Sequence, residues 1–308
     1  MRLWSDMKLG QRTGMLMPAG ENGCLEGAEK VQKDKITNNE TTNKQTTNKQ
    51  TRIHTVIMLI GLILIIFACF NLVKIIKNYY TSRKIYGDLN QQYVTEEPVS
   101  ETVDGTEEER PWYELASVDL KALQEQNPEV AGWIYFENED ISYPVMYSGD
   151  NEKYLRTTWS GVSASAGSLF IEEANSPDFE DCHTLIYGHN MKDLSMFGKL
   201  KYYKEKDDYY EDHQFFQIFS GNEIYRYQIF AYEDVDADSF VYSVPYAEDD
   251  AFQDFIDEIY KISYKQTGVT ATNMNKVITL STCSNDDKRF VVHAVRVNQY
   301  NTSEGEAE

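Results

Sequence analysis

Cysteine is scarce in this sequence, with four residues among 308. Only Cys182 and Cys283 follow the long apolar segment near the N-terminus. Two cysteines in a domain of about 200 residues are far fewer than a disulfide-stapled scaffold needs. The sequence therefore excludes a disulfide framework, and each thiol has to be explained as a core residue or as a chemical group.

Positive charge is also scarce. The chain has 29 Lys and Arg against 50 Asp and Glu, a formal net charge of −21 at pH 7. Proteins that bind nucleic acid carry basic patches, so this balance argues against nucleic acid as a partner. Residues 1–55 hold nine Lys and Arg and six Asp and Glu, a net charge of +3, which leaves about −24 for the rest.

An uncharged apolar run, residues 56–70, separates these two parts and extends to residue 76 with Lys74 as its one interruption. A bilayer span needs about 20 such residues. A cleaved signal peptide is the alternative, but an A-x-A-like cleavage site is lacking after Phe70. We therefore predict an uncleaved transmembrane anchor at residues 53–76.

Basic residues flank the anchor on both sides, so the positive-inside rule alone does not decide its orientation. A single N-terminal anchor before a large acidic domain favours a single-pass protein of the cell membrane, with a cytoplasmic N-terminus and an extracellular C-terminal domain.

The remaining boundaries follow from composition. Residues 1–52 are polar and poor in aromatic residues, which predicts a disordered cytoplasmic tail. Residues 77–110 include a run rich in Glu and predict an extended acidic stalk. The folded domain is expected at residues 111–300, and residues 301–308 are expected to be a disordered tail.

Short segments rich in β-branched and aromatic residues fill this domain and alternate with turn signals. They are residues 132–136, 141–146, 167–171, 184–187, 215–219, 225–232, 277–282 and 290–296. Such a density of short strands predicts a mainly β (α+β) fold, a sandwich or a barrel. Helical spacing of apolar residues predicts helices at residues 112–126 and 248–262.

One strand ends on a candidate nucleophile. Residues 277–282 lead directly to Cys283, a polar loop follows, and Arg289 precedes the next strand. A thiol at a strand end with a cation facing it is an arrangement suited to nucleophilic catalysis, with the cation stabilising an oxyanion. The alternative is a buried structural cysteine.

A thiol nucleophile needs a base, and His189 is the best placed of five histidines. It follows the strand 184–187 and Gly188, at a strand-to-loop junction. His54 belongs to the membrane edge, while His293 lies inside an apolar strand and is expected to be structural. Cys182 precedes His189 by seven residues, roughly 20 Å along an extended strand, so we expect it to be buried and inert.

Several of these residues together resemble one family. Residues 279–283, TLSTC, resemble the TLxTC signature of the sortases, with a matching arginine at Arg289 and histidine at His189. The YGHNM run at 187–191 resembles the class B branch, as do the segments NP at 127, GWI at 132, YPV at 143, DN at 150, YL at 154 and GSLF at 167. The similarity covers residues 111 to 298 in order.

The resemblance implies a closed eight-stranded sortase-type β-barrel, with an N-terminal helix and a helix before the cysteine strand. It also implies a membrane-anchored cysteine transpeptidase of Gram-positive bacteria, in which Cys283 attacks a sorting-signal peptide, His189 moves protons and Arg289 holds the oxyanion or substrate carbonyl. The thioacyl-enzyme passes to a cell-wall amine on a peptidoglycan precursor. The residues implied for substrate binding are Asn151, Leu155, Tyr187, Ser281 and Thr282.

Acidic residues at 172–181 raise the question of calcium, which some sortases use, but their spacing matches no calcium loop. We predict no metal and no cofactor. Three alternatives remain: a pilus-assembling sortase with a pilin lysine as acceptor, a non-enzymatic peptide-binding surface domain, and a papain-like hydrolase. The last is disfavoured because histidine precedes cysteine here.

Overall fold

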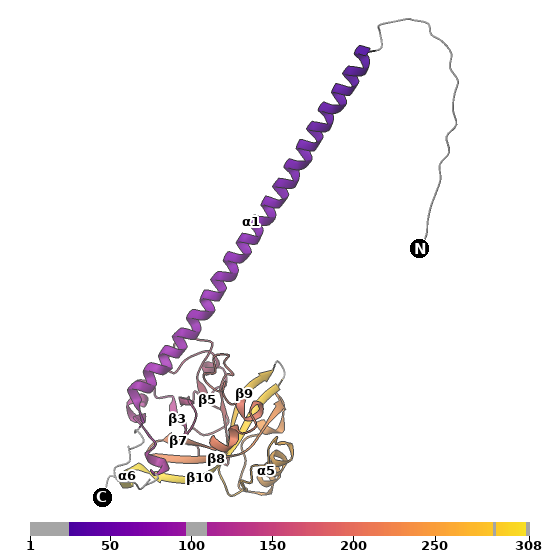
Figure 1. Ribbon diagram of the computed structural model, residues 1–308. Helices are drawn as coiled ribbons and strands as arrows, with labels where there is room; N and C mark the ends of the chain where they lie inside the picture. Colours follow the sequence, from indigo (N-terminus) through magenta and orange to yellow (C-terminus); the bar gives the residue numbers. More distant parts are fainter. Residues whose placement is uncertain (1–24, 97–109, 286–287, 306–308) are drawn as a thin grey trace, which may run out of the picture. The chain divides into compact units, whose positions relative to one another are not determined.

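The computed structural model describes residues 25–96, 110–285 and 288–305. The chain divides into two compact units, Met1–Asn71 and Leu72–Glu308. The described part of the first unit belongs to helix α1 (Leu25–Tyr93) (Figure 1). This helix is long and apolar enough to cross a membrane, and its large apolar side chains between Val56 and Phe70 are exposed. Both observations are consistent with the predicted anchor.

The predicted disordered tail, residues 1–52, is wrong for residues 25–52, which are helical; residues 1–24 lie outside the described part. The polar composition prevents these residues from building a core, but it does not prevent a helix already nucleated in the apolar segment from extending. Threonine hydroxyls also bond carbonyls four residues back, as from Thr37 to Lys33 and from Thr41 to Thr37.

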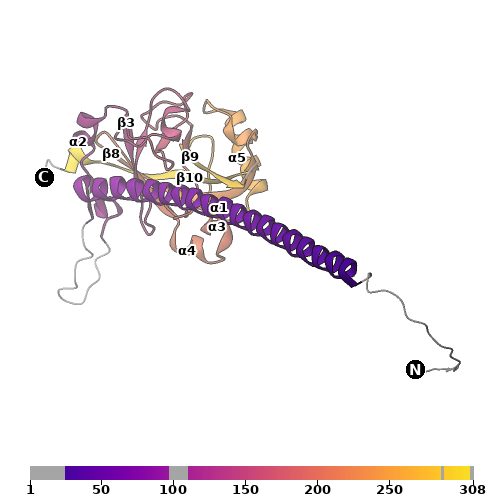
Figure 2. The same ribbon diagram turned by 90° about the horizontal axis from the view of Figure 1, so that it is seen from above.

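The second unit is built on a closed barrel of eight strands (Figures 1 and 2). Around the barrel the order is β10, β8, β7, β3, β4, β5, β6 and β9. The pairs β4–β5 and β6–β9 are parallel and the other pairs are antiparallel. The predicted eight-stranded barrel is therefore confirmed. The strands are β3 (Val130–Phe136), β4 (Ser142–Met146), β5 (Leu169–Ile171), β6 (His183–Tyr187), β7 (Phe215–Ser220), β8 (Glu223–Asp236), β9 (Val277–Asn285) and β10 (Lys288–Asn301).

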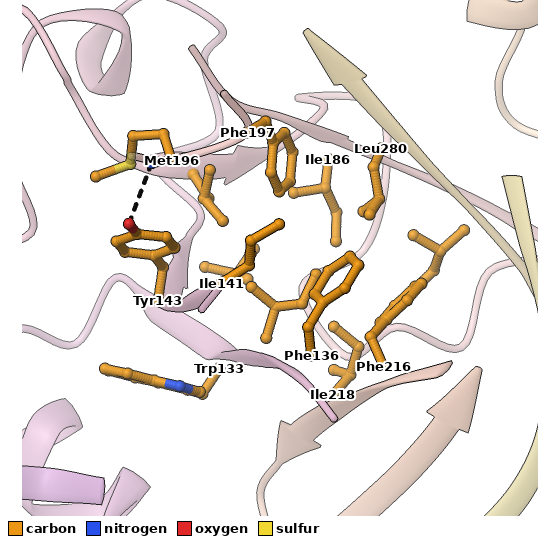
Figure 3. Close-up of a cluster of buried hydrophobic side chains, with 14 of the residues drawn as sticks. Trp133, Phe136, Ile141, Tyr143, Ile186, Met196, Phe197, Phe216, Ile218 and Leu280 are labelled. Carbon is orange, nitrogen blue, oxygen red and sulfur yellow. Dashed lines mark hydrogen bonds between the residues drawn. The ribbon is translucent and has the colours of Figure 1, made fainter. Parts of the chain in front are cut away.

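Apolar side chains fill the barrel interior because successive strand residues point to opposite faces. Figure 3 shows part of this core, with Phe136 beside Phe216 and with Ile186 beside Leu280. The hydroxyl of Tyr143 accepts a hydrogen bond from the Met196 backbone N–H at 3.1 Å, which anchors the loop after β6 to the core.

A second cluster lies under helix α5 (Asp250–Ile262), which confirms the predicted helix before the cysteine strand. Asp249 caps its first turn by accepting from the N–H groups of Ala251 and Phe252. The buried face of α5 packs on Val277 and Val295 of β9 and β10 through Phe252, Phe255, Ile256 and Ile259. The helix therefore supports the cysteine strand from outside the barrel.

The predicted helix at residues 112–126 is only partly correct. The chain forms a short 3-10 helix η1 (Trp112–Glu114), strand β2 (Ala116–Val118) and then helix α2 (Leu120–Gln126). Strand β2 pairs with β1 (Val94–Glu96), a partner distant in sequence. The side chain of Asp119 accepts from Ala122 N–H and starts the helix only at this point.

The predicted start of the folded domain at Pro111 is too late. Residues Tyr86, Leu89 and Tyr93 in the last turns of α1 belong to the core cluster of the barrel unit. The predicted stalk is therefore a packed helix up to Tyr93, and residues 97–109 lie outside the described part. The remaining elements are η2 (Lys153–Leu155), α3 (Tyr202–Glu205), α4 (Tyr209–Asp212), η3 (Phe240–Tyr242) and α6 (Thr302–Gly305), which covers part of the predicted C-terminal tail.

Candidate active site

Strands β6 and β9 bring the candidate base and nucleophile to one edge of the barrel. They run parallel, with Tyr187 opposite Ser281, and the Gly188 N–H donates to the Ser281 carbonyl at 3.0 Å. Cys283 lies two residues further along β9, and His189 lies two residues after Tyr187, in the loop that follows β6. Since parallel strands leave a sheet at the same edge, the pairing places both residues there.

Strand β10 adds the arginine to the same edge. It pairs antiparallel with β9, and Arg289 lies directly opposite Cys283 in the register. The Arg289 guanidinium donates to the Lys288 carbonyl at 3.3 Å from Nη1 and is partly buried. The structure describes the backbone of Cys283, and its side chain lies outside the described part.

A cavity of about 280 Å³ opens at this edge. It is lined by Asn151, Leu155, Ser168, Phe170, Tyr187, Gly188, His189, Ser281, Thr282 and Arg289. The structure thus brings together seven of the eight predicted site residues, with Cys283 adjoining them through the backbone. A larger cavity of about 770 Å³, between α1, the β3–β4 turn and residues 193–199, contains none of them. Volume alone does not locate the site.

The imidazole of His189 is held by one backbone carbonyl. Its Nε2 donates to the Leu155 carbonyl at 2.7 Å, which places the proton on Nε2 in this arrangement. Glycine at position 167 lets this carbonyl lie close to the chain, because its φ is +55° and a Cβ there would lie 2.7 Å from the Leu155 oxygen and 2.3 Å from that of Tyr154.

Two polar walls of the cavity share one carboxylate. Asn151 Nδ2 donates to Glu172 Oε1 and the Tyr187 hydroxyl donates to Glu172 Oε2, both at 2.7 Å. The Glu173 N–H in turn donates to Asn151 Oδ1 at 3.0 Å. Burial, followed by the contact with Glu172, raises the pKa of Tyr187 above its usual range, so the phenol is neutral and donates.

The hydroxyls just before Cys283 differ in their surroundings. Ser281 Oγ lies 2.9 Å from the hydroxyl of Tyr242, whose ring stacks near that of Tyr187 with centroids 6.3 Å apart. The Thr282 hydroxyl is buried and has no hydrogen-bond partner among the described residues. Such a group at a cavity wall is available to a ligand, since an unpaired buried hydroxyl is costly.

Within the barrel unit, the thiol of Cys182 and the imidazoles other than His189 do not line the cavity. Cys182 comes just before β6, at the end of that strand opposite to His189, and it is buried, which raises its pKa. His183 and His293 are fully buried in a polar network beneath α5. His213 stacks on the ring of Tyr209.

The structure also adds site residues that the sequence prediction left out. Ser168 and Phe170 line the cavity from the GSLF segment, which resembles the family pattern but carries no chemical signal of its own. Glu172 was considered only as a calcium ligand, and Tyr242 comes from the β8–α5 connection, where no motif points to it. Among the described residues, no group of three or more His, Cys, Asp or Glu side chains could hold a metal ion.

A family model of the sortase domain matches residues 134–297, just over half of the chain. With the barrel and the strand edge described above, this match shows that the chain belongs to the sortase family, whose members are cysteine transpeptidases.

The relatives identify the class B branch. Sortase B of Listeria monocytogenes is 34% identical over 168 residues, 54% of this chain and 68% of the relative. Sortase B of Staphylococcus aureus is 29% identical over 180 residues, 57% of this chain and 73% of the relative. The solved structure of sortase B from B. anthracis in complex with AAEK1 matches with a TM-score of 0.60 and 29% identity, and covers 73% of this chain and 100% of that one.

Proposed function

We propose that this chain is a membrane-anchored transpeptidase that cleaves a C-terminal sorting signal of surface proteins and transfers them to a cell-wall amine. The observation that carries the proposal is the strand register, in which Tyr187 pairs with Ser281 and Cys283 with Arg289. A solved complex of S. aureus sortase B with substrate supports substrate binding by this fold. It is similar with a TM-score of 0.54 and 27% identity, and covers 58% of this chain and 84% of that one.

The proposed reaction has two acyl transfers. The Cys283 thiolate attacks a peptide carbonyl carbon, and the C–N bond breaks as His189 protonates the leaving amine. An incoming amine then attacks the thioester, loses its proton to His189 and displaces the thiolate, which restores the enzyme. Arg289 stabilises the oxyanion formed in each step.

The cavity walls suit an extended peptide. Leu155 is 41% exposed and offers an apolar contact, whereas Asn151 and Tyr187 offer polar ones. We assign substrate binding to these three residues and to Ser281 and Thr282. A cavity with an apolar lining and a few placed polar groups is typical of a binding site for a peptide side chain.

The apolar helix provides the proposed attachment to the cell membrane. With a cytoplasmic N-terminus, residues 53–76 would span the bilayer once and the barrel would lie outside the cell. There it would meet surface proteins during export and the peptidoglycan precursor whose amine accepts them.

The test compares the two cysteines in the full chain, purified in detergent. A library of peptides that each contain one Thr–Xaa bond between varied flanks is incubated with the wild type, Cys283→Ala and Cys182→Ala. We expect Cys283→Ala to lose all cleavage and Cys182→Ala to keep most of it, because Cys182 is buried away from the cavity. Mass spectrometry should find an acyl adduct on Cys283 in the wild type and in Cys182→Ala, and no acyl adduct in Cys283→Ala.

Added amines separate the remaining alternatives. A peptidoglycan-type amine or a lysine peptide should accept the acyl group. Faster transfer to the peptidoglycan-type amine would support cell-wall anchoring, and faster transfer to the lysine peptide would support pilus assembly. Binding of library peptides without any cleavage or adduct would instead support a peptide-binding surface domain. Cleavage that survives in Cys283→Ala would overturn the site assignment.

A further inference from the structure

Glu172 connects two walls of the cavity that come from different parts of the chain. Asn151 precedes η2, Tyr187 ends β6, and Glu172 directly follows β5. Each oxygen of the carboxylate accepts one hydrogen bond of 2.7 Å, from Asn151 Nδ2 and from the Tyr187 hydroxyl. Glu172 itself is not among the residues that line the cavity.

We propose that Glu172 is a positioning residue that sets which polar groups Asn151 and Tyr187 present to the substrate. The inference rests on the proposed function, because it concerns binding in the same cavity. Glu172 touches no reacting atom in this arrangement and acts only through its two partners. Bonds to a carboxylate are about twice as strong as neutral ones, so the carboxylate fixes both side chains firmly.

The directions of these bonds determine what each wall offers. The Asn151 amide is held at both ends, with Nδ2 on Glu172 and Oδ1 on the Glu173 N–H, so it cannot flip without losing both bonds. The Tyr187 hydroxyl donates its one proton to the hydrogen bond with Glu172, so towards the cavity it can only accept a hydrogen bond. A fixed amide donor and a fixed phenol acceptor form a defined pattern for the polar groups of a peptide.

An anionic residue is needed for this pattern. A glutamine at the same place has an acceptor oxygen at one position and a donor NH₂ group at the other, so it cannot accept at both of the positions where Oε1 and Oε2 of Glu172 accept. If its oxygen stays on Asn151, its NH₂ donates to Tyr187 and frees the phenol proton for the cavity. Glu172→Gln therefore keeps the size of the side chain while it reverses the role of Tyr187.

The first test measures steady-state cleavage by the full chain in detergent, with the best substrate of the Thr–Xaa library. We expect Glu172→Gln to raise KM about tenfold with kcat within about twofold, since a binding contact is lost in the ground state and transition state alike. Glu125→Gln is the matched control, because it removes an exposed carboxylate on α2, outside the cavity lining, and should leave KM unchanged. Thermal unfolding of each variant checks the fold.

A double-mutant cycle separates positioning from a general structural role. In a chain that already carries Asn151→Ala and Tyr187→Phe, Glu172→Gln should change KM by less than about twofold, because the groups it positions are gone. A tenfold effect that persists in this background would overturn the proposal, as would a wild-type KM in Glu172→Gln alone.

Two further measurements distinguish this proposal from the proposed function. Binding of the same peptide library to the Cys283→Ala chain requires no chemistry, and Glu172→Gln should weaken it about tenfold. An ultraviolet titration of Tyr187, taken as the difference from Tyr187→Phe, should show the phenol ionising at lower pH in Glu172→Gln, because the bonded anion is gone. Normal binding and an unchanged titration in Glu172→Gln would overturn the proposal, even in a protein that cleaves peptides.

Discussion

At the scale of single residues, the barrel holds a buried polar chain beneath α5. It runs from Glu233 through His293 and Thr279 to His183, with distances of 2.8, 2.7 and 2.7 Å, and ends at the Ser243 carbonyl, 3.3 Å from His183 Nδ1. A carbonyl only accepts, so Nδ1 of His183 carries the proton and Nε2 accepts from the Thr279 hydroxyl. His183 is therefore neutral in the folded protein.

This neutral state predicts how stability depends on pH. Burial, with the nearby His293 second, lowers the pKa of His183 from 6.5 to about 3. Below pH 6.5 the unfolded chain binds a proton at His183 that the folded chain does not bind. The contribution of His183 to the free energy of unfolding is therefore complete above pH 6.5 and is lost as the pH falls towards 3. In that window His183 should lower the free energy of unfolding by about 1.4 kcal/mol per pH unit.

Urea unfolding of the full chain at several pH values between 3 and 6.5 checks this prediction. The variant His183→Gln has no ionisable group there, so its free energy of unfolding should fall less steeply with acid than that of the wild type. Equal slopes for the two proteins would mean that His183 takes up its proton in the folded state.

Residue types at motif spacing predicted Cys283, His189 and Arg289 as partners, and the structure places Arg289 opposite Cys283 and lines one cavity with His189 and Arg289. Their catalytic roles stay a prediction. Glu172 was not predictable in this way. Its role depends on two donors, Asn151 and Tyr187, that approach only once β5, β6 and the turn before η2 are folded. A carboxylate in an acidic stretch has no local signal that separates a positioning role from a solvated one.

At the scale of elements, the end of α1 is joined to the active-site edge. The Tyr86 hydroxyl donates to the Gly167 carbonyl at 2.5 Å and lies 3.0 Å from Ser168 Oγ. Gly167 packs against the Leu155 carbonyl that holds His189, and Ser168 lines the cavity. The last turns of α1 therefore support the segment that orients the candidate base.

Removing this hydroxyl should weaken both the fold and the site. Tyr86→Phe removes the hydroxyl that donates to the buried Gly167 carbonyl, which should lower the free energy of unfolding by about 1–3 kcal/mol. We expect kcat to fall as well, because the turn at Leu155 is less firmly held. Tyr80→Phe is the matched control, since Tyr80 is 70% exposed and its change should stay within about 0.5 kcal/mol. Equal effects of the two substitutions would contradict the support role.

The elements differ in how far the sequence predicted them. All eight barrel strands and α5 were predictable, since their apolar patterns persist over several residues and are bounded by turn signals. The segment 112–126 was not predictable, because strand β2 forms only through its pairing with β1. The helical spacing of the apolar residues in this segment predicted a helix instead. Packing between distant segments overrides local pattern in such cases.

At the scale of the whole molecule, composition misplaced the start of the folded unit. Tyr86, Leu89 and Tyr93 are core side chains, but most of their neighbours in the sequence are charged or polar. The composition of this stretch therefore resembles that of a solvated stalk. The Tyr93 carbonyl also accepts a hydrogen bond from the Asp119 N–H at 2.9 Å, and the Tyr93 hydroxyl accepts one from the side chain of Gln126. The end of α1 is therefore an integral part of the barrel unit.

Two shortened chains test this boundary. A chain that begins at Leu72 keeps these contacts and should unfold at the same temperature as the full chain and cleave peptide at the same rate. A chain that begins at Pro111 loses three buried side chains worth about 1.5–3 kcal/mol each. That sum, about 5–9 kcal/mol, approaches the total stability of an ordinary domain, so this shorter chain should not fold cooperatively. A synthetic peptide of residues 72–96 should restore its folding if the contacts themselves are required. Cooperative unfolding of the shorter chain near the wild-type temperature, without the peptide, would instead place the boundary where composition alone suggests.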